Sequence, residues 1–192
     1  QIVADRDAMF RIGSITKQFT AAAIMKLVED GAIDLDAAMT EYLPDYPAGE
    51  HTVTVRHLLN HTSGIPSYTG LDEWEPTIPL ELTDDELLAY FKDLPFEFEP
   101  GTDWKYNNSG YYLLGMIIES ASDQAWHEYM HETFFASIGM EHTRVGSNTD
   151  IIPNRVQGYE FKGGELANDD LIGMNQPGAA GALIASAGDL IR

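Results

Sequence analysis

The hydrophobic and polar positions of residues 14–30 follow the period of an α-helix. Apolar side chains recur at spacings of three and four residues, at Phe19, Ala23, Ile24, Leu27 and Val28. This spacing places them on one face of a helix. Gly31 follows the apolar positions, where a glycine commonly ends a helix. The pattern therefore predicts a helix from Ser14 to Asp30.

Three further stretches have helical patterns. Residues 52–66, TVTVRHLLNHTSGIP, predict a short helix that is ended by Gly64 and Pro66. Residues 83–94 begin with a capping box, in which Thr83 is followed by Glu86 three positions later. This segment is expected to turn three side chains toward the core, namely Leu87, Leu88 and Phe91. The third stretch begins at residues 103–121, DWKYNNSGYYLLGMIIESA, which predict a loop and then an apolar helix at about 109–120. A second helix is predicted at about 123–136.

The clearest β-strand pattern lies at residues 155–166, RVQGYEFKGGEL, and predicts a hairpin that turns at Gly163 and Gly164. Strand patterns are scarce elsewhere, so we expect a mainly helical chain. The sequence contains no internal repeat and no linker. We therefore interpret residues 1–192 as a single domain.

Composition narrows the classes of partner. The 192 residues carry 31 acidic and 11 basic side chains, and the net charge of -20 argues against binding to nucleic acid or to anionic membrane surfaces. The 44% hydrophobic content indicates a folded core. No apolar run reaches the roughly 18 residues that span a bilayer, and the first residues lack signal-peptide features. The absence of cysteine excludes disulfides and thiolate metal sites.

Ser14 and Lys17 form an SxxK pattern at the start of the first predicted helix. Side chains at i and i+3 share a helix face, so the hydroxyl and the amine can meet. A serine hydroxyl becomes a good nucleophile when a base removes its proton, and a desolvated lysine with a lowered pKa can be that base. The pattern alone is weak, because an N-capping serine followed by a surface lysine has the same spacing.

Tyr106 and Asn108 form a YxN pattern in the loop before the apolar helix. A tyrosine hydroxyl can relay a proton between nucleophile and leaving group, and an asparagine amide can hold a substrate carbonyl. The structural alternatives are a packed aromatic ring and an asparagine that caps the helix. The presence of this pair together with the SxxK pattern favours a catalytic interpretation.

Five blocks resemble, in order and spacing, the serine β-lactamase-related family, which includes class C β-lactamases, D-alanyl-D-alanine peptidases, esterases and amidases. The blocks are FRIGSITKQFTAAAIMKLVEDGAIDLDA, VTVRHLLNHTSGIPSY, PGTDWKYNNSGYYLLG, FFASIGMEHT and GALIASAGDLIR. The resemblance implies an α+β fold of the β-lactamase/transpeptidase type. It also implies a serine hydrolase that acts on an amide, peptide, β-lactam or ester, and it favours a periplasmic or secreted location.

The resemblance also implies roles for four residues. Ser14 would be the acylated nucleophile, Lys17 its basic partner and Tyr106 the second member of the proton relay. Asn108 would contact the substrate and the lysine. No cofactor and no metal is implied. We interpret the HTSG block at residues 61–64 as a turn and leave it out of the catalytic set, and we interpret the spacing of His57 and His61 as structural.

Two features of the family are not found between residue 1 and Arg192. These are the third motif, KTG or HxG, and the strand hairpin before the serine helix. We therefore expect mainly the helical lobe and the nucleophile helix, with most of the central antiparallel sheet missing from this chain. A helix without its sheet exposes apolar surface. A second chain or a homodimer is therefore expected to cover Phe19, Ala23, Ile24 and Leu27.

A rival motif is HEYMH, from His127 to His131, which matches the HExxH pattern of helical zinc sites. The extended zinc motif fails because Phe134 and Ser137 occupy its glycine and third histidine positions. Glu160 or Glu165 remains as a candidate third ligand. We expect no metal here. The histidines should lie on the polar side of a helix, remote from Ser14, and that helix should bury Trp126, Met130 and Phe134.

A third hypothesis belongs to another class of protein. The chain could be a non-catalytic binding module that keeps the fold without a complete site. Covalent labelling of Ser14 distinguishes an enzyme from such a module, and metal analysis distinguishes both from a zinc hydrolase.

Overall fold

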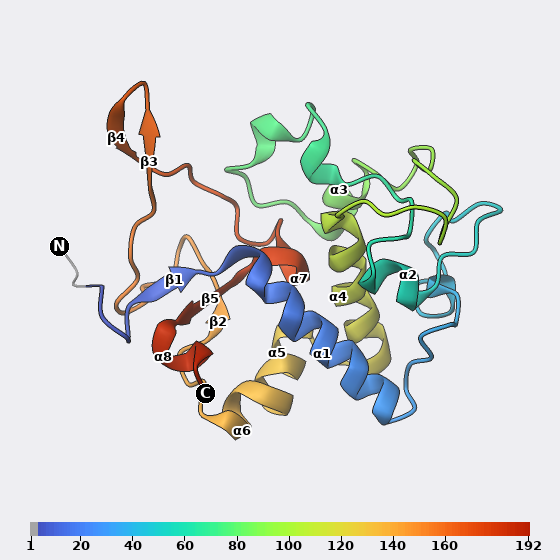
Figure 1. Ribbon diagram of the computed structural model, residues 1–192, viewed down its shortest axis with the longest axis horizontal. Coiled ribbons are helices and arrows are strands. Elements are labelled where there is room, and N and C mark those ends of the chain that lie inside the picture. The colour runs from blue at the N-terminus through green and yellow to red at the C-terminus, as the bar shows by residue number, and fades with distance from the viewer. Residues whose placement is uncertain (1–3) are drawn as a thin grey trace.

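The computed structural model describes residues 4–192, and Figure 1 shows a helical part beside a small sheet. Two long helices, α1 (Thr16–Glu29) and α4 (Asn108–Ser122), pack against each other. The shorter helices are α2 (Val55–Leu59), α3 (Asp84–Leu88), α5 (Trp126–Met130), α6 (Ala136–Ile138), α7 (Gly178–Gly181) and α8 (Ala187–Leu190). The 3₁₀ turns are η1 (Gly13–Ile15), η2 (Met39–Glu41), η3 (Tyr68–Gly70) and η4 (Glu75–Thr77). No helix among residues 4–192 is long and apolar enough to cross a bilayer.

A three-stranded antiparallel sheet is present that the sequence pattern did not predict. Its order is β1 (Met9–Arg11), β5 (Leu183–Ser186) and β2 (Arg144–Val145), so that the last strand among residues 4–192 lies at the centre. All four residues of β5 are buried, and its sequence therefore lacks the alternation that identifies a half-buried strand. A single strand, β1, leads directly into the first helical turn.

The predicted hairpin is confirmed. Strands β3 (Tyr159–Lys162) and β4 (Glu165–Asn168) pair in antiparallel register around Gly163 and Gly164. Both glycines have positive φ, at 63° and 90°, a conformation that other residues rarely adopt. In Figure 1 the hairpin projects away from the rest of the molecule.

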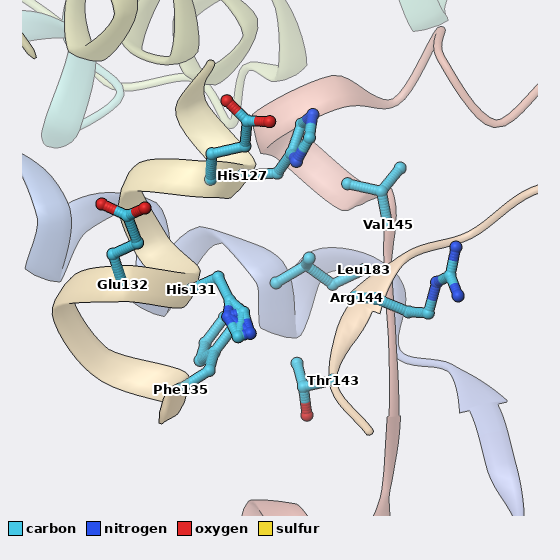
Figure 2. Close-up of a pocket in the computed structure, with 9 residues that line it drawn as sticks. His127, His131, Glu132, Phe135, Thr143, Arg144, Val145 and Leu183 are labelled. Atoms are coloured by element: carbon cyan, nitrogen blue, oxygen red, sulfur yellow. The ribbon is translucent and has the colours of Figure 1, made fainter. Parts of the chain in front are cut away.

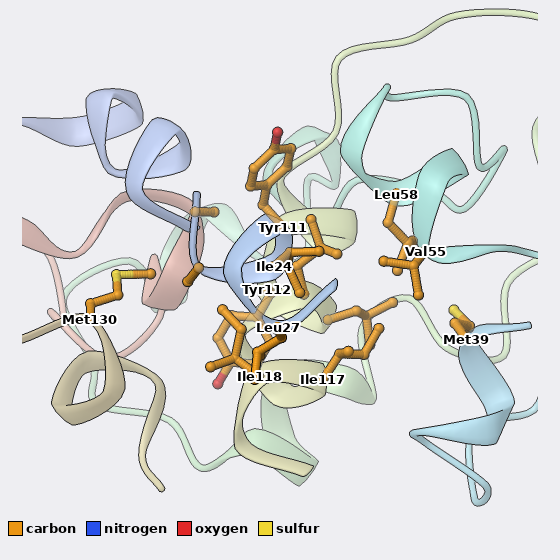
Figure 3. Packing of buried hydrophobic residues seen from close by; sticks show 14 of the residues in the cluster. Ile24, Leu27, Met39, Val55, Leu58, Tyr111, Tyr112, Ile117, Ile118 and Met130 are labelled. Atoms are coloured by element: carbon orange, nitrogen blue, oxygen red, sulfur yellow. The ribbon is translucent and has the colours of Figure 1, made fainter. Parts of the chain in front are cut away.

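The apolar face of α1 is buried, so the expected exposure of this helix is wrong. Ala23 and Ile24 are fully buried and Leu27 is 4% exposed. Phe19 is half-buried and meets the ring of Phe135 edge-on, with centroids 5.3 Å apart. Figure 3 shows the reason, because the side chains of Ile24 and Leu27 point into the cluster formed with α4. The predicted apolar stripe thus faces the helical part of this chain.

The short helix predicted within residues 52–66 ends earlier than expected. Helix α2 ends at Leu59, five residues before Gly64, because His61 leaves helical geometry with a φ of 61°. The capping box of Thr83 and Glu86 is confirmed at the start of α3.

The predicted helix at 123–136 contains a π-helical segment between α5 and α6, η5 (His131–Phe135). A π-helical turn inserts one extra residue and rotates the positions that follow it. Phe135 is therefore the buried phenylalanine, whereas Phe134 is half-buried, contrary to the predicted face. Met130 is buried as predicted, and Trp126 is half-buried.

Candidate active site

Ser14 lies in η1, directly before α1, where it is exposed to solvent. Lys17 lies one turn later on the same face of the helix and is only 6% exposed. Lys17 Nζ donates to Ser14 Oγ at 3.2 Å, so the spacing of three residues brings the two groups together as predicted. Ser14 is also in the first helical turn, where backbone N–H groups lack intrahelical partners and the helix dipole favours negative charge.

Two further acceptors fix the amine of Lys17. Asn108 Oδ1 and the carbonyl oxygen of Ala180 each accept from Nζ at 2.8 Å. A protonated lysine has three N–H bonds, and the three acceptors use all of them. When the amine is neutral, it can keep the bonds to Asn108 and Ala180 and turn its lone pair toward Ser14. The arrangement thus suits an amine that accepts a proton from the serine hydroxyl.

The surroundings of Lys17 make the neutral amine accessible. Burial lowers the pKa of Lys17, because the ammonium loses hydration, while the neighbouring Tyr106 has a smaller effect that raises the pKa. The rings of Tyr106 and Tyr111 lie near the amine, with centroids 4.8 Å and 5.5 Å from Nζ. These aromatic faces stabilise the cation in place of water and oppose part of the burial effect.

Tyr106 reaches the same serine from the loop before α4. Its hydroxyl donates to Ser14 Oγ at 2.8 Å, and its side chain is 43% exposed. The hydroxyl of Ser14 therefore contacts both Lys17 and Tyr106, although Tyr106 is separated from Ser14 by 92 positions in the chain. This contact between distant segments is the main geometric feature of the site.

Asn108 is held by both ends of its amide. Oδ1 accepts from Lys17, and Nδ2 donates to Thr69 Oγ1 at 2.8 Å. The helix cap that the sequence allowed at Asn108 is made instead by Asn107, whose side chain accepts from the backbone N–H of Gly110 at 2.8 Å. Since the preceding residue caps the helix, the side chain of Asn108 is free to bond Lys17 and Thr69.

Sequence reasoning missed the contribution of α7 and β5. Besides Ala180, the carbonyl of Ala179 accepts from Thr20 Oγ1 at 2.6 Å, and the backbone N–H of Leu183 donates to Thr16 Oγ1 at 3.2 Å. The hydroxyls of Thr16 and Thr20 are buried, so these bonds tie the serine helix firmly to residues 179–183. Main-chain carbonyls carry no residue-type signal, which is why the sequence did not point to them.

A cavity of about 320 Å³ opens beside Ser14 and Asn108. Its apolar lining includes Tyr68, Trp74 and Met174, and Arg11 lies at its edge. Gln176 is buried next to this lining, and its side chain links the segment that contains Met174 to residues 74–80. The side chain of Gln176 accepts from Trp74 Nε1 at 2.6 Å and donates to the carbonyls of Thr77 and Leu80 at 2.7 Å and 2.6 Å.

His127 and His131 line a different cavity, of about 560 Å³, between the α5–η5 helix and strands β2 and β5. Figure 2 shows the two histidines on the helix side, across from Val145 and Leu183. Both are exposed, as predicted for the polar side of the helix. Within residues 4–192, no group of three or more His, Asp or Glu side chains is arranged to hold a metal ion. Ser14, Lys17, Tyr106 and Asn108 do not line this cavity.

Known structures share this arrangement of elements. D-amino acid amidase from Ochrobactrum anthropi superposes with a TM-score of 0.84 at 32% identity, over 97% of this chain and 54% of that chain. A D-stereospecific amidohydrolase from Streptomyces has a TM-score of 0.84 at 29% identity, over 96% of this chain and 59% of the other. The fold is therefore α+β, of the β-lactamase and penicillin-binding-protein type.

Sequence comparisons agree with the structural ones. "Penicillin-binding protein 4*" from Bacillus subtilis is 34% identical over 81% of this chain. The matched part is 34% of that relative, so the chain spans about a third of its length. The family model described as Beta-lactamase matches residues 2–192. With nearly the whole sequence matched and the fold shared, this chain belongs to the beta-lactamase family.

Proposed function

We propose that this chain carries the acylation site of a serine hydrolase that acts on amide, peptide, β-lactam or ester bonds. Ser14 is the nucleophile, Lys17 and Tyr106 move its proton, and Asn108 contacts the substrate and Lys17. The observation that carries the proposal is the convergence of Lys17 Nζ and Tyr106 Oη on Ser14 Oγ, at 3.2 Å and 2.8 Å. Both distances are within the reach required for proton transfer or one small adjustment from it.

The reaction would proceed in two stages. Neutral Lys17 takes the proton of Ser14 as Oγ bonds to the substrate carbonyl carbon, and the negative charge that forms on the carbonyl oxygen is favoured near the helix N-terminus. The bond to the leaving group then breaks, and the leaving group takes up a proton that Tyr106 passes on from the lysine. Water attacks the resulting serine ester, releases the acid and returns the proton to Ser14.

The nature of the relatives suggests which substrates to assay first. Two of the similar structures are a D-amino acid amidase and a D-stereospecific amidohydrolase, and a third, at 18% identity, is a hydrolase with promiscuous acyltransferase activity. The last shows likeness of fold alone. We therefore propose amides of D-amino acids as the first substrates, with D-peptides, penicillins and simple esters as comparisons.

Covalent labelling tests the proposal directly. A fluorescent fluorophosphonate should label the wild-type chain, and peptide mass spectrometry should locate the adduct on Ser14. Ser14→Ala should not be labelled, whereas Ser137→Ala, at an exposed serine of α6, should be. A folded wild-type chain that is not labelled by the fluorophosphonate or by a fluorescent penicillin would overturn the proposal and favour the non-catalytic binding module.

A further inference from the structure

The partly buried ring of His61 packs against the ring of Tyr106. The imidazole and phenol rings have centroids 4.6 Å apart, with planes inclined by 38°. The ring of Tyr111 lies 5.1 Å from the same imidazole, at an angle of 34°. Tilted aromatic contacts at these distances are favourable, and together they place the histidine ring between a core tyrosine and the tyrosine that contacts Ser14.

The backbone on both sides of Tyr106 is bound to the same histidine. The N–H of Lys105 donates to the carbonyl oxygen of His61 at 3.0 Å, and the N–H of Asn107 donates to His61 Nδ1 at 3.1 Å. The position of Tyr106 is thus fixed by backbone hydrogen bonds at Lys105 and Asn107 and by the contact of its own ring with His61. A side chain in an exposed loop keeps a defined position only when its neighbours fix it in this way.

The conformation of His61 serves these contacts. Its φ of 61° is in the left-handed region, which non-glycine residues seldom adopt, although histidine does so more often than most. The same turn is closed at Gly64, whose φ is 72° and where an added Cβ would lie 2.0 Å from the carbonyl oxygen of Phe98. The turn predicted for the HTSG block is therefore present, and it aims the imidazole at the loop of Tyr106.

We propose that His61 is a positioning residue that holds the Tyr106 hydroxyl against Ser14 Oγ. The inference rests on the proposed function, because the position of Tyr106 affects a rate only if Ser14 is acylated. His61 does not itself touch Ser14. It acts through Tyr106, by ring contact and by the acceptor that Nδ1 offers to the Asn107 N–H.

The acceptor role requires Nδ1 to be unprotonated. Burial lowers the pKa of His61, and the nearby Lys17 ammonium lowers it further. The other charged group close in sequence is Lys105, whose amine pairs with Glu97 at 2.7 Å. The aromatic neighbours of the imidazole are Tyr106, Tyr111 and Trp104. The neutral imidazole that the geometry requires is therefore the form expected at neutral pH.

Two substitutions separate the contacts. His61→Phe keeps a ring against Tyr106 and removes the Nδ1 acceptor, whereas His61→Asn tolerates the positive φ and offers an oxygen acceptor without the ring. We expect each variant to slow the saturating rate of Ser14 labelling by about 10- to 100-fold, with little change in the half-saturating reagent concentration. The matched control is His51→Phe, since His51 also stacks on an aromatic ring, that of Phe96 at 4.2 Å. Its labelling rate should equal that of the wild type.

A double-mutant cycle distinguishes positioning from a general loss of structure. In the Tyr106→Phe background the substitutions at His61 should have no further effect on labelling, because the hydroxyl that they position is gone. Nitrogen-15 NMR of the wild-type chain should show His61 with an unprotonated Nδ1 and a pKa below its usual value of 6.5. Wild-type labelling rates in both His61 variants, equal losses in the Tyr106→Phe background, or a protonated Nδ1 at neutral pH would overturn the inference. A wild-type chain without Ser14 labelling would instead overturn the proposed function.

Discussion

Two short motifs of this chain have similar helical spacing and very different surroundings. Ser14 and Lys17 are three residues apart at the start of α1, and His127 and His131 are four residues apart across α5 and η5. The serine pair receives side chains or carbonyls from the loop before α4 and from α7, all within hydrogen-bond distance. The histidine pair is exposed beside a cavity and, among the described residues, belongs to no group that could hold a metal.

Residue spacing therefore supplies only the first contact of a site. Reactivity requires groups from elsewhere in the chain, which remove water, change a pKa and fix the direction of each polar atom. Lys17 has this environment, because it is buried and has three acceptors. His127 remains on a solvated helix face.

Replacing Lys17 by methionine should decrease the rate of Ser14 labelling by about 10²- to 10⁴-fold, because methionine fills the same space without a base. The comparable change at the other motif, Glu128→Gln, removes the carboxylate that a zinc hydrolase would use as its base. It should leave labelling at the wild-type rate. Stopped-flow measurements with a fluorophosphonate give both values. Loss of labelling in Glu128→Gln together with normal labelling in Lys17→Met would reverse the comparison.

The pH dependence of labelling should report the amine of Lys17. Burial lowers the pKa of this lysine below 10.5, so the neutral amine forms at a lower pH than in a free lysine. Since the neutral form is the base, the labelling rate should rise with pH, about tenfold per unit below that pKa, and level off above it. The wild-type profile should level off below pH 10.5, and Lys17→Met should lack the lysine-dependent rise. A wild-type rate that does not change with pH would argue against Lys17 as the base.

Much of the helical fold could be predicted because it depends on local signals. The capping box at Thr83, the glycine turn at 163–164 and the amphipathic face of α1 all involve residues close together in sequence. The sheet could not be predicted, since β5 is buried throughout and pairs with β1 across more than 170 positions. Its wholly buried residues show no alternation, so no local pattern marks it as a strand.

The candidate site likewise combines features that local sequence signals predict with features that depend on long-range packing. The SxxK and YxN pairs follow from residue types, whereas the carbonyl of Ala180 and the contacts of His61 depend on how distant segments pack. The apolar stripe of α1 was identified correctly but assigned to the wrong partner, because an amphipathic pattern shows that a face is buried and not what covers it.

Gln176→Ala should destabilise the chain by about 2–3 kcal/mol, because it leaves the indole N–H of Trp74 and the partly buried carbonyls of Thr77 and Leu80 without their partner. Gln124→Ala is the control near the histidine motif. Gln124 donates to Glu132 at 3.1 Å in an exposed contact, and its loss should change stability by less than about 0.5 kcal/mol. Urea unfolding followed by circular dichroism measures both. Equal effects of the two substitutions would show that the wall of the cavity beside Ser14 does not depend on Gln176.

The smallest effect is expected at the histidine pair itself. His127→Ala and His131→Ala remove exposed side chains, so the free energy of unfolding should change by less than about 0.5 kcal/mol and Ser14 labelling should be unchanged. Treatment with EDTA, followed by added zinc, should shift the urea midpoint of the wild-type chain no more than that of the double variant. A specific zinc site would behave differently, since zinc at 100 times its Kd would stabilise the folded wild-type chain by about 2.7 kcal/mol and leave the double variant unaffected. Such a zinc-dependent difference would show that residues beyond the two histidines complete a metal site. Both motifs would then recruit groups from distant segments, and they would differ only in the reaction that those groups support.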